Sequence, residues 1–377
     1  MGGALARCVG DPERFEREIW GRRHDIRRGD DPAAFADVFG VDALDAFVTD
    51  AVRRPLVRVV DRGEPLPETA YTARVRLGGH DFRDVVDPDQ LARLFHGGAT
   101  VVAQSLHRTE AGVRAFTTEL GDEISHPVQA NAYLSPSGSA GLARHADLHD
   151  VVVIQLSGSK RWWLGDDEPF ELHAGDTMYL PAGLEHRAAA TDTSSLHLTI
   201  GILRVTYRQV VARLLAQGVD ELDRPLPLRY RTHADATDPS LEVGLAEAIR
   251  AAGEHLGRLD ASAVARQESA RPPLRRPRPG SLSSAIAVSD IVLDTCLRRG
   301  DDPWEITVDD DRAHVVTTRR RFDAPAAVEP ALRRLADDTW SAVGDLPGLD
   351  EASRIVVARR LVREGLCRIV APGHTPG

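Results

Sequence analysis

The segment Val128-Gln-Ala-Asn-Ala-Tyr-Leu134 alternates apolar and polar residues, a pattern typical of a β-strand with one buried face. A loop rich in serine and glycine follows it, and a second apolar run, Val151 to Leu156, ends at another glycine-containing turn. Further short apolar segments come soon after, at Trp162–Leu164, Glu171–His173, Thr177–Leu180 and Leu196–Leu203. Several short strands separated by glycine and proline turns predict a β-sandwich or barrel, for which the double Greek-key jelly roll is the closest template.

Helical patterns flank this strand-rich region on both sides. Before it, the pairs Asp11-Pro12, Asp31-Pro32 and Asp87-Pro88 are typical helix starts, because an acidic N-cap residue precedes a proline in the first turn. After it, residues 206–270 have a helical pattern, residues 271–280 are rich in proline and arginine, and residues 281–377 combine helices with a β-ribbon. We therefore expect an α+β chain with a barrel domain in residues 1–205, a helical region, a linker and a small winged-helix-like domain.

The composition argues against several classes of function. The chain has 377 residues, enough for two or three domains, and its net charge of −10 argues against a nucleic-acid partner. No apolar run is long enough to span a membrane, and the first residues, MGGALARCVGDPERF, lack the apolar core of a signal peptide. Cys8, Cys296 and Cys367 form no CxxC pair, so neither a zinc site nor a disulfide framework is expected. These features predict a cytoplasmic protein without a membrane partner.

Two histidines and one aspartate in the strand-rich region have the spacing of a metal site. His145-Ala-Asp147 places an imidazole and a carboxylate on the same side of an extended segment, and His186 follows a turn at the end of a strand. Two imidazoles and one carboxylate on one face of an ion are the ligand set of non-haem Fe(II) oxygenases. We therefore expect His145, Asp147 and His186 to bind iron and to form the catalytic centre.

The tripeptide His-x-Asp has little specificity by itself, because a surface turn with an acidic capping residue has the same composition. The chain contains a second identical copy, His233-Ala-Asp235, in a polar stretch that has no strand pattern and no turn-borne histidine after it. We expect this second copy not to bind metal.

One residue type is almost absent: of the 47 basic residues, only Lys160 is a lysine. It lies at a turn between two predicted strands, where a lysine is usually solvated. A 2-oxo dicarboxylate that chelates iron needs a cation for its distal carboxylate, however, and a guanidinium is not equivalent to a compact ammonium. Lys160 is therefore our candidate co-substrate anchor. Asn131 and Tyr133 share one face of the preceding strand, where they could bond the same molecule or form a polar pair on a solvated face.

Several motifs together resemble the JmjC-type ribosomal oxygenases, protein hydroxylases of the cupin superfamily. The segment from Asn131 through His145-Ala-Asp147 is similar to the family's first-ligand segment. Gln155-Leu-Ser-Gly-Ser-Lys160-Arg-Trp162 is similar to its co-substrate strand and turn, and residues 175–186 resemble the segment with the last ligand. The resemblance covers nearly the whole chain.

The resemblance implies a double-stranded β-helix (cupin or jelly-roll) JmjC domain, helices for dimerisation in residues 206–270, and a C-terminal winged-helix domain in residues 281–377. It implies that His145, Asp147 and His186 bind Fe(II), that Lys160 pairs with 2-oxoglutarate with the help of Asn131 and Tyr133, and that O2 is the other co-substrate. The expected protein is a homodimeric dioxygenase that hydroxylates an amino-acid side chain in a ribosomal protein or another polypeptide.

Two departures from the family's pattern leave the substrate open. Ala146 stands where the family often has an aromatic residue, and residues 134–144 contain Arg144 but no acid. The same chemistry on a peptide natural product or a free amino acid is therefore a second hypothesis. A non-enzymatic protein-binding scaffold is a third, and the presence of all three ligands and of Lys160 argues against it.

Overall fold

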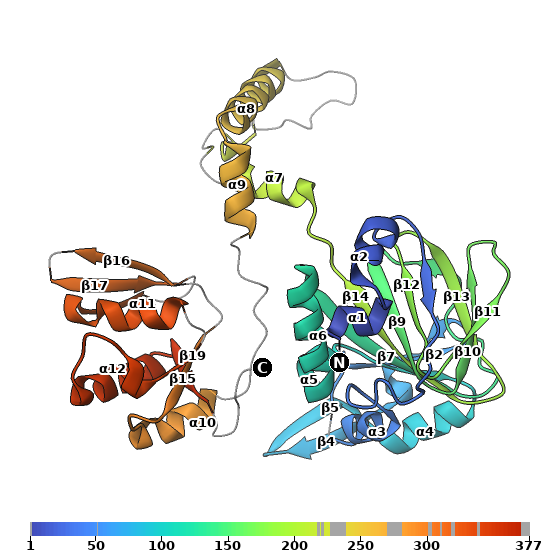
Figure 1. Ribbon diagram of the computed structural model, residues 1–377. Helices are drawn as coiled ribbons and strands as arrows, with labels where there is room; N and C mark the ends of the chain where they lie inside the picture. The colour runs from blue at the N-terminus through green and yellow to red at the C-terminus, as the bar shows by residue number, and fades with distance from the viewer. Residues whose placement is uncertain are drawn as a thin grey trace. The chain divides into compact units, whose positions relative to one another are not determined.

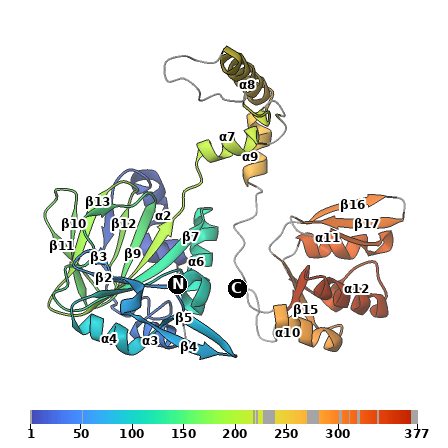
Figure 2. The same ribbon diagram turned by 180° about the vertical axis from the view of Figure 1, so that it is seen from behind.

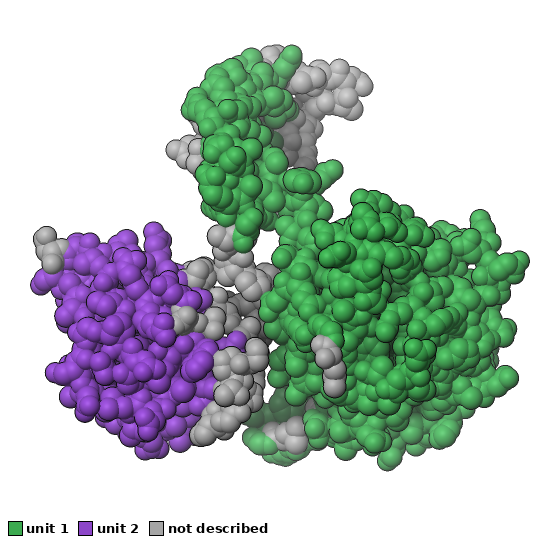
Figure 3. Space-filling view, in the orientation of Figure 1, with its two compact units in different colours: residues 1–269 green, residues 270–377 purple. Residues whose placement is uncertain are grey.

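The structure is a computed structural model that describes residues 2–50, 52–216, 219, 222–226, 239–269, 281–300, 304–309, 311–317, 321–337 and 340–370. The chain divides into two compact units, residues 1–269 and residues 270–377, coloured green and purple in Figure 3. Each unit has its own hydrophobic core. The predicted linker at residues 271–280 lies outside the described residues.

Two antiparallel sheets build the barrel of the first unit (Figure 1). The larger sheet has the strand order β1 (Asp25–Arg27), β12 (Thr177–Leu180), β9 (Asp150–Ser157), β14 (Ser195–Ile202), β7 (Val128–Ser135), β6 (Thr100–Ala103), β2 (Val57–Asp61) and β3 (Glu64–Pro65). The smaller sheet has the order β11 (Phe170–His173), β10 (Ser159–Leu164), β13 (Glu185–Ala190) and β8 (His145–Ala146). The strands predicted between residues 128 and 203 are present, and the two sheets also contain short strands for which no range was predicted, among them β1, β3, β8 and β13.

The alternation along β7 reflects two different environments on its two faces. Ala130 and Ala132 are buried in the core that this sheet shares with the helices, whereas Asn131 and Tyr133 line a cavity inside the barrel. A second, smaller core fills the barrel between the two sheets and includes Val151, Val153, Trp162, Leu164, Leu172, Met178 and Leu180. The larger sheet therefore buries both faces, one against helices and one inside the barrel.

Helices in the first part of the chain cover the outer face of the larger sheet. The helices α5 (Leu106–Thr109) and α6 (Ala111–Ile124) contact β7, and α1 (Ala4–Val9) contacts α6 (Figure 1). Figure 2 shows α6 beside β7 from behind. The remaining elements are α3 (Val41–Thr49), the hairpin of β4 (Thr72–Leu77) and β5 (His80–Val86), and α4 (Pro88–His96). In α4 the predicted cap is confirmed, because the Asp87 carboxylate accepts hydrogen bonds from the backbone N–H groups of Asp89 and Gln90.

The other two Asp-Pro pairs, Asp11-Pro12 and Asp31-Pro32, do not begin long α-helices. Asp11 caps α2 (Pro12–Arg14), which continues as a π-helix over Phe15–Ile19. The helix predicted after Asp31 is wrong: residues 32–38 form consecutive turns. The backbone N–H groups of Ala34, Ala36 and Val38 bond to carbonyls three residues earlier, so the chain is wound too tightly for an α-helix.

Three helices follow the barrel, namely α7 (Tyr207–Leu215), α8 (Pro239–Gly257) and α9 (Ala261–Ser269). Thr206 begins α7 with a capping box, in which its hydroxyl bonds the Gln209 N–H and the Gln209 side chain bonds the Thr206 N–H. Apolar side chains on these helices are exposed, including Tyr207 at 92% and Ile249 at 72%. Among the described helices, none is long and apolar enough to span a membrane.

The second unit contains two three-stranded sheets and three α-helices in its described residues. One sheet has the order β19 (Trp340–Ala342), β15 (Cys296–Arg299) and β20 (Cys367–Ile369), and the other the order β16 (Glu305–Asp309), β17 (Arg312–Val316) and β18 (Arg321–Pro325). The helices are α10 (Ser281–Ile286), α11 (Glu329–Asp337) and α12 (Glu351–Arg363). The apolar patterns of Pro330–Leu335 and of residues 349–361 predict helices, which α11 and α12 confirm. The pattern of Ile286–Leu297 also predicts a helix, which is wrong, because Cys296 and Leu297 belong to the central strand of a sheet.

Candidate metal centre

The two histidines of the predicted triad lie directly opposite each other on neighbouring strands. In the antiparallel pair of β8 and β13, His145 is the partner of His186 and Ala146 is the partner of Glu185. The centroids of the two imidazole rings are 4.4 Å apart. A cross-strand pair brings two side chains together from segments far apart in the sequence. The strand β13 is therefore what places the second histidine beside the first.

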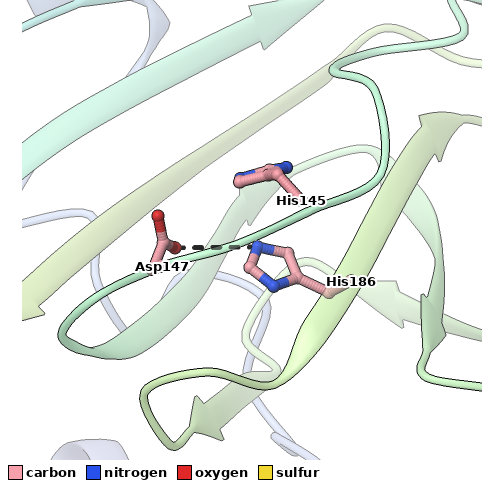
Figure 4. Close-up of side chains that lie close together, drawn as sticks. All are labelled: His145, Asp147 and His186. Carbon is pink, nitrogen blue, oxygen red and sulfur yellow. Dashed lines mark ion pairs between the residues drawn. The ribbon is translucent and has the colours of Figure 1, made fainter.

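Asp147 completes the group from the end of β8. One oxygen of its carboxylate lies 3.7 Å from His186 Nε2. One potential ligand atom from each of the three residues lies within 4.8 Å of the other two. Figure 4 shows the three side chains pointing toward one another. A carboxylate and two imidazoles at this separation can hold one metal ion.

In both imidazole rings a hydrogen bond at Nδ1 leaves Nε2 free to bind a metal. His145 Nδ1 donates to the Ala143 carbonyl at 2.8 Å, and His186 Nδ1 donates to the Leu184 carbonyl at 3.0 Å. A proton fixed on Nδ1 leaves the Nε2 lone pair free, which is how metal-binding histidines are commonly oriented. Burial lowers the pKa of His186, which favours the neutral ring that a metal requires. The donor set therefore fits a divalent metal.

The second His-x-Asp tripeptide, His233-Ala-Asp235, lies outside the described residues. The prediction that it does not bind metal stays a prediction.

Lys160 is buried in the same cavity, with only 1% of its surface exposed. Its Nζ donates to Ser135 Oγ at 3.0 Å and lies 3.4 Å from His197 Nδ1. Burial lowers its pKa to about 7. In the described part of the chain no carboxylate forms an ion pair with it. A solvated turn lysine is therefore excluded, and the described residues supply no counter-ion for the charged form of this amine.

Asn131 and Tyr133, which their alternation predicted to share a face, both line the cavity. The Asn131 side-chain oxygen accepts a hydrogen bond from the Ser105 backbone N–H at 2.9 Å, so part of this amide is engaged within the protein. The Tyr133 ring stacks on His197 with the centroids 4.9 Å apart. Burial raises the pKa of the Tyr133 hydroxyl, which keeps it a neutral hydrogen-bonding group.

Several residues that were not predicted as site residues line this cavity or contact Lys160. Ser135 and His197 contact Lys160, and His197 pairs with Tyr133 across β7 and β14. Away from Lys160, Gln129 Nε2 and His149 Nε2 lie 3.5 Å apart. A Cβ on Gly201 would lie 2.3 Å from His149 Nε2, so the glycine leaves room for this ring. The alternation of Ser195-Leu-His197-Leu-Thr199 marks His197 as sharing a face with Ser195, but only the strand pairing identifies its neighbours.

This fold and site define a class of domain. Residues 113–170 and 166–210 match the family described as "JmjC domain". Residues 113–210 are therefore similar to a JmjC domain, and the predicted resemblance to JmjC-type ribosomal oxygenases is confirmed by the relatives that follow.

The chain is 27% identical over 214 residues to "Ribosomal oxygenase 1" of Gallus gallus. This match covers 50% of this chain and 34% of that protein. It is 28% identical over 170 residues to "Bifunctional lysine-specific demethylase and histidyl-hydroxylase NO66" of Dictyostelium discoideum, covering 35% of this chain and 33% of that protein. The matched part thus spans about a third of each relative. A solved structure, "YcfD, a Ribosomal oxygenase from Escherichia coli", shares the fold with a TM-score of 0.50 and 18% identity, over 97% of this chain and 99% of that one.

Proposed function

We propose that this chain is an Fe(II)- and 2-oxoglutarate-dependent oxygenase that hydroxylates an amino-acid side chain of a polypeptide, with a ribosomal protein as the first candidate. One observation carries the proposal. A triad of two histidines and one aspartate shares a cavity with a buried lysine that has no carboxylate partner among the described residues. A metal site alone would not require that lysine, whereas a metal site that also binds a dicarboxylate would.

His145, Asp147 and His186 are the residues that would hold the iron, through Nε2 of each histidine and a carboxylate oxygen. Three protein ligands on one face leave the opposite face for co-substrates. With 2-oxoglutarate and O2, bound Fe(II) supplies an oxidant able to hydroxylate an unactivated C–H bond, with succinate and carbon dioxide as co-products. The protein contributes the ligand geometry, the binding of the dicarboxylate and the exclusion of bulk water.

Lys160 would pair with the distal carboxylate of 2-oxoglutarate. Along β10 and β13, Leu164 is opposite His186 and Lys160 is opposite Ala190, so four residues of strand separate the ligand from the amine. At roughly 3.3 Å per residue, this separation is about 13 Å along the strand. The side chains of His186 and Lys160 both extend into this stretch of the cavity. The space left between them has room for a short dicarboxylate. Tyr133 and Asn131 line the same interval and would assist.

The cavity walls between the polar groups are apolar. Val151, Val153, Trp162, Leu180 and Ala188 line the cavity beside the metal ligands. Apolar walls limit the number of water molecules near the reacting centre and strengthen the charge interaction between Lys160 and a carboxylate.

We propose further that residues 206–270 form a dimerisation region and that residues 281–377 form a winged-helix-like domain for protein contacts. The exposed apolar side chains of α7 and α8 support the first assignment, because contiguous exposed apolar surface is typical of interaction sites. The excess of acidic residues over arginines in residues 281–377 supports the second and argues against DNA as a partner.

Mass spectrometry tests the proposed reaction. Ribosomal proteins from cells with and without this gene should differ by the mass of one oxygen atom on one residue. The purified chain should also convert 2-oxoglutarate to succinate only with Fe(II). A modified peptide natural product or free amino acid, found while the ribosomal proteins are unchanged, would favour the second hypothesis. Failure to convert 2-oxoglutarate with any substrate would favour a scaffold.

A further inference from the structure

A buried carboxylate connects the two chain segments that carry the metal-binding residues. Asp150 is the first residue of β9 and is 0% exposed. Its Oδ1 accepts a hydrogen bond from the backbone N–H of Ala182 at 2.7 Å. Ala182 belongs to the turn between β12 and β13, four residues before His186. Asp150 itself is three residues after Asp147.

A second hydrogen bond joins the same two segments. The backbone N–H of Gly183 donates to the backbone carbonyl of Asp147 at 2.8 Å. Two successive N–H groups of the turn are therefore held by the segment that carries Asp147. The Asp147 carboxylate and the His186 ring then face each other at 3.7 Å. The backbone that sets this separation is fixed on one side by Asp150.

Burial of the Asp150 carboxylate costs free energy, which argues that its contacts have a role beyond stability. Its second oxygen, Oδ2, lies 3.5 Å from Arg204 Nε, and the Tyr179 hydroxyl also interacts with this carboxylate. A buried carboxylate with one short hydrogen bond and otherwise loose contacts is seldom favourable for stability alone.

We propose that Asp150 is a positioning residue of the metal centre, which holds the turn at residues 181–183 against the Asp147 segment and so sets the separation of Asp147 and His186. The inference rests on the proposed metal site. Residues that orient metal ligands without touching the ion commonly change metal affinity by roughly 10–100-fold when they are removed.

The chain offers a matched control in Asp176. This carboxylate is also buried, at 4% exposure, and it accepts hydrogen bonds from two backbone N–H groups, those of Gly29 and His173, where the Asp150 carboxylate accepts one. It also pairs with an arginine, Arg28. It organises the turn between β11 and β12, however, and none of these bonds involves the segments of the metal-binding residues. Loss of either carboxylate removes a turn-organising group, but only Asp150 is joined to the triad.

The experiment compares Co(II) binding by the full chain and by the variants Asp150→Ala, Asp150→Asn and Asp176→Ala, using visible absorption and calorimetry, with the thermal midpoint measured for each. We expect both alanine variants to be less stable, but only Asp150→Ala to lose about tenfold or more in Co(II) affinity. Asp150→Asn keeps an oxygen for the Ala182 N–H but loses the negative charge that strengthens this bond and pairs with Arg204, so its Co(II) affinity should lie between those of the unaltered chain and Asp150→Ala.

Two results would overturn the inference while the proposed metal site stands. One is wild-type Co(II) affinity in Asp150→Ala, and the other is an equal loss of affinity in Asp176→Ala. If Asp150→Ala does not fold, wild-type affinity together with an unchanged absorption spectrum in Asp150→Asn would count against it, and a changed spectrum would support it. Absence of Co(II) binding by the unaltered chain would instead reject the metal site and this inference together.

Discussion

Lys160 Nζ lies 3.4 Å from His197 Nδ1, so an amine and an imidazole that are both buried share the inner end of the barrel cavity. Burial and the neighbouring lysine lower the pKa of His197 well below its ordinary value, so its ring is neutral and can accept a hydrogen bond from the amine. The pair can therefore orient Lys160 without neutralising it. This leaves the positive charge of Lys160 available for an anion.

The first prediction concerns the anchoring of 2-oxoglutarate. Loss of a charge-assisted contact to a buried carboxylate costs about 2–5 kcal/mol, so Lys160→Ala should weaken 2-oxoglutarate binding by at least roughly tenfold. Metal affinity should stay unchanged, because Lys160 does not contact the triad. Lys160→Arg should be intermediate, since the charge is kept on a longer, planar group. Calorimetry with the Co(II)-loaded protein measures both affinities.

Arg161→Ala is the matched control for this prediction. Arg161 is the next residue on β10, is exposed, and pairs with Glu171 on the outside of the barrel. Its loss should leave 2-oxoglutarate binding as in the unaltered protein. An unchanged co-substrate affinity in Lys160→Ala would remove Lys160 from the proposed site.

The second prediction is a pH dependence of co-substrate binding. Burial places the pKa of Lys160 at about 7 in the free protein, and a bound carboxylate raises it. Above pH 7 binding must therefore be accompanied by proton uptake, and affinity should fall toward about tenfold per pH unit. Below pH 7 the amine is already charged, so affinity should be nearly constant.

Calorimetry in buffers with different ionisation enthalpies measures this proton uptake directly. In Lys160→Arg the uptake should disappear, because a guanidinium stays charged over the whole range. Affinity that rises with pH in the unaltered protein would contradict the assignment.

The third prediction separates the two His-x-Asp copies. Alanine in place of His145, Asp147 or His186 should abolish both Co(II) binding and the conversion of 2-oxoglutarate, because two ligands seldom retain a divalent ion. Alanine at His233 or Asp235 should leave both nearly intact. Succinate formation measures turnover, and the assignment fails if His233→Ala is inactive while His145→Ala is active.

The fourth prediction concerns assembly through residues 206–270. Light scattering should give about twice the mass of one 41.1 kDa chain at micromolar concentration. Ile249→Asp places a charge on an apolar side chain of α8 that is 72% exposed, and it should shift the protein toward the monomer. Val356→Asp, at a 63% exposed position on α12, is the control and should leave the mass unchanged. A monomeric unaltered chain would reject the dimer.

The sequence alone was sufficient to predict the barrel, the triad and the candidate anchor. Period-two alternation reveals which residues of β7 share a face, because a strand places successive side chains on opposite sides regardless of its partner. His145 and Asp147 are two residues apart, so their common face follows from the same local rule. Lys160 stood out by composition, as the only lysine of the chain. The alternation and the spacing of His145 and Asp147 are local features and the Lys160 argument comes from composition, so none of these three depends on knowing which strands pair.

Only the tertiary structure decided which distant segments meet. The register of β8 against β13 places His186 opposite His145, and the pairing of β14 with β7 places His197 beside Tyr133. The bond from Ala182 to Asp150 joins residues 32 positions apart. A one-residue slip in a strand pairing would turn every side chain to the other face, and no local pattern specifies the pairing. Local backbone geometry thus determines which residues can act together along one strand, whereas strand pairing and burial determine which strands bring them together.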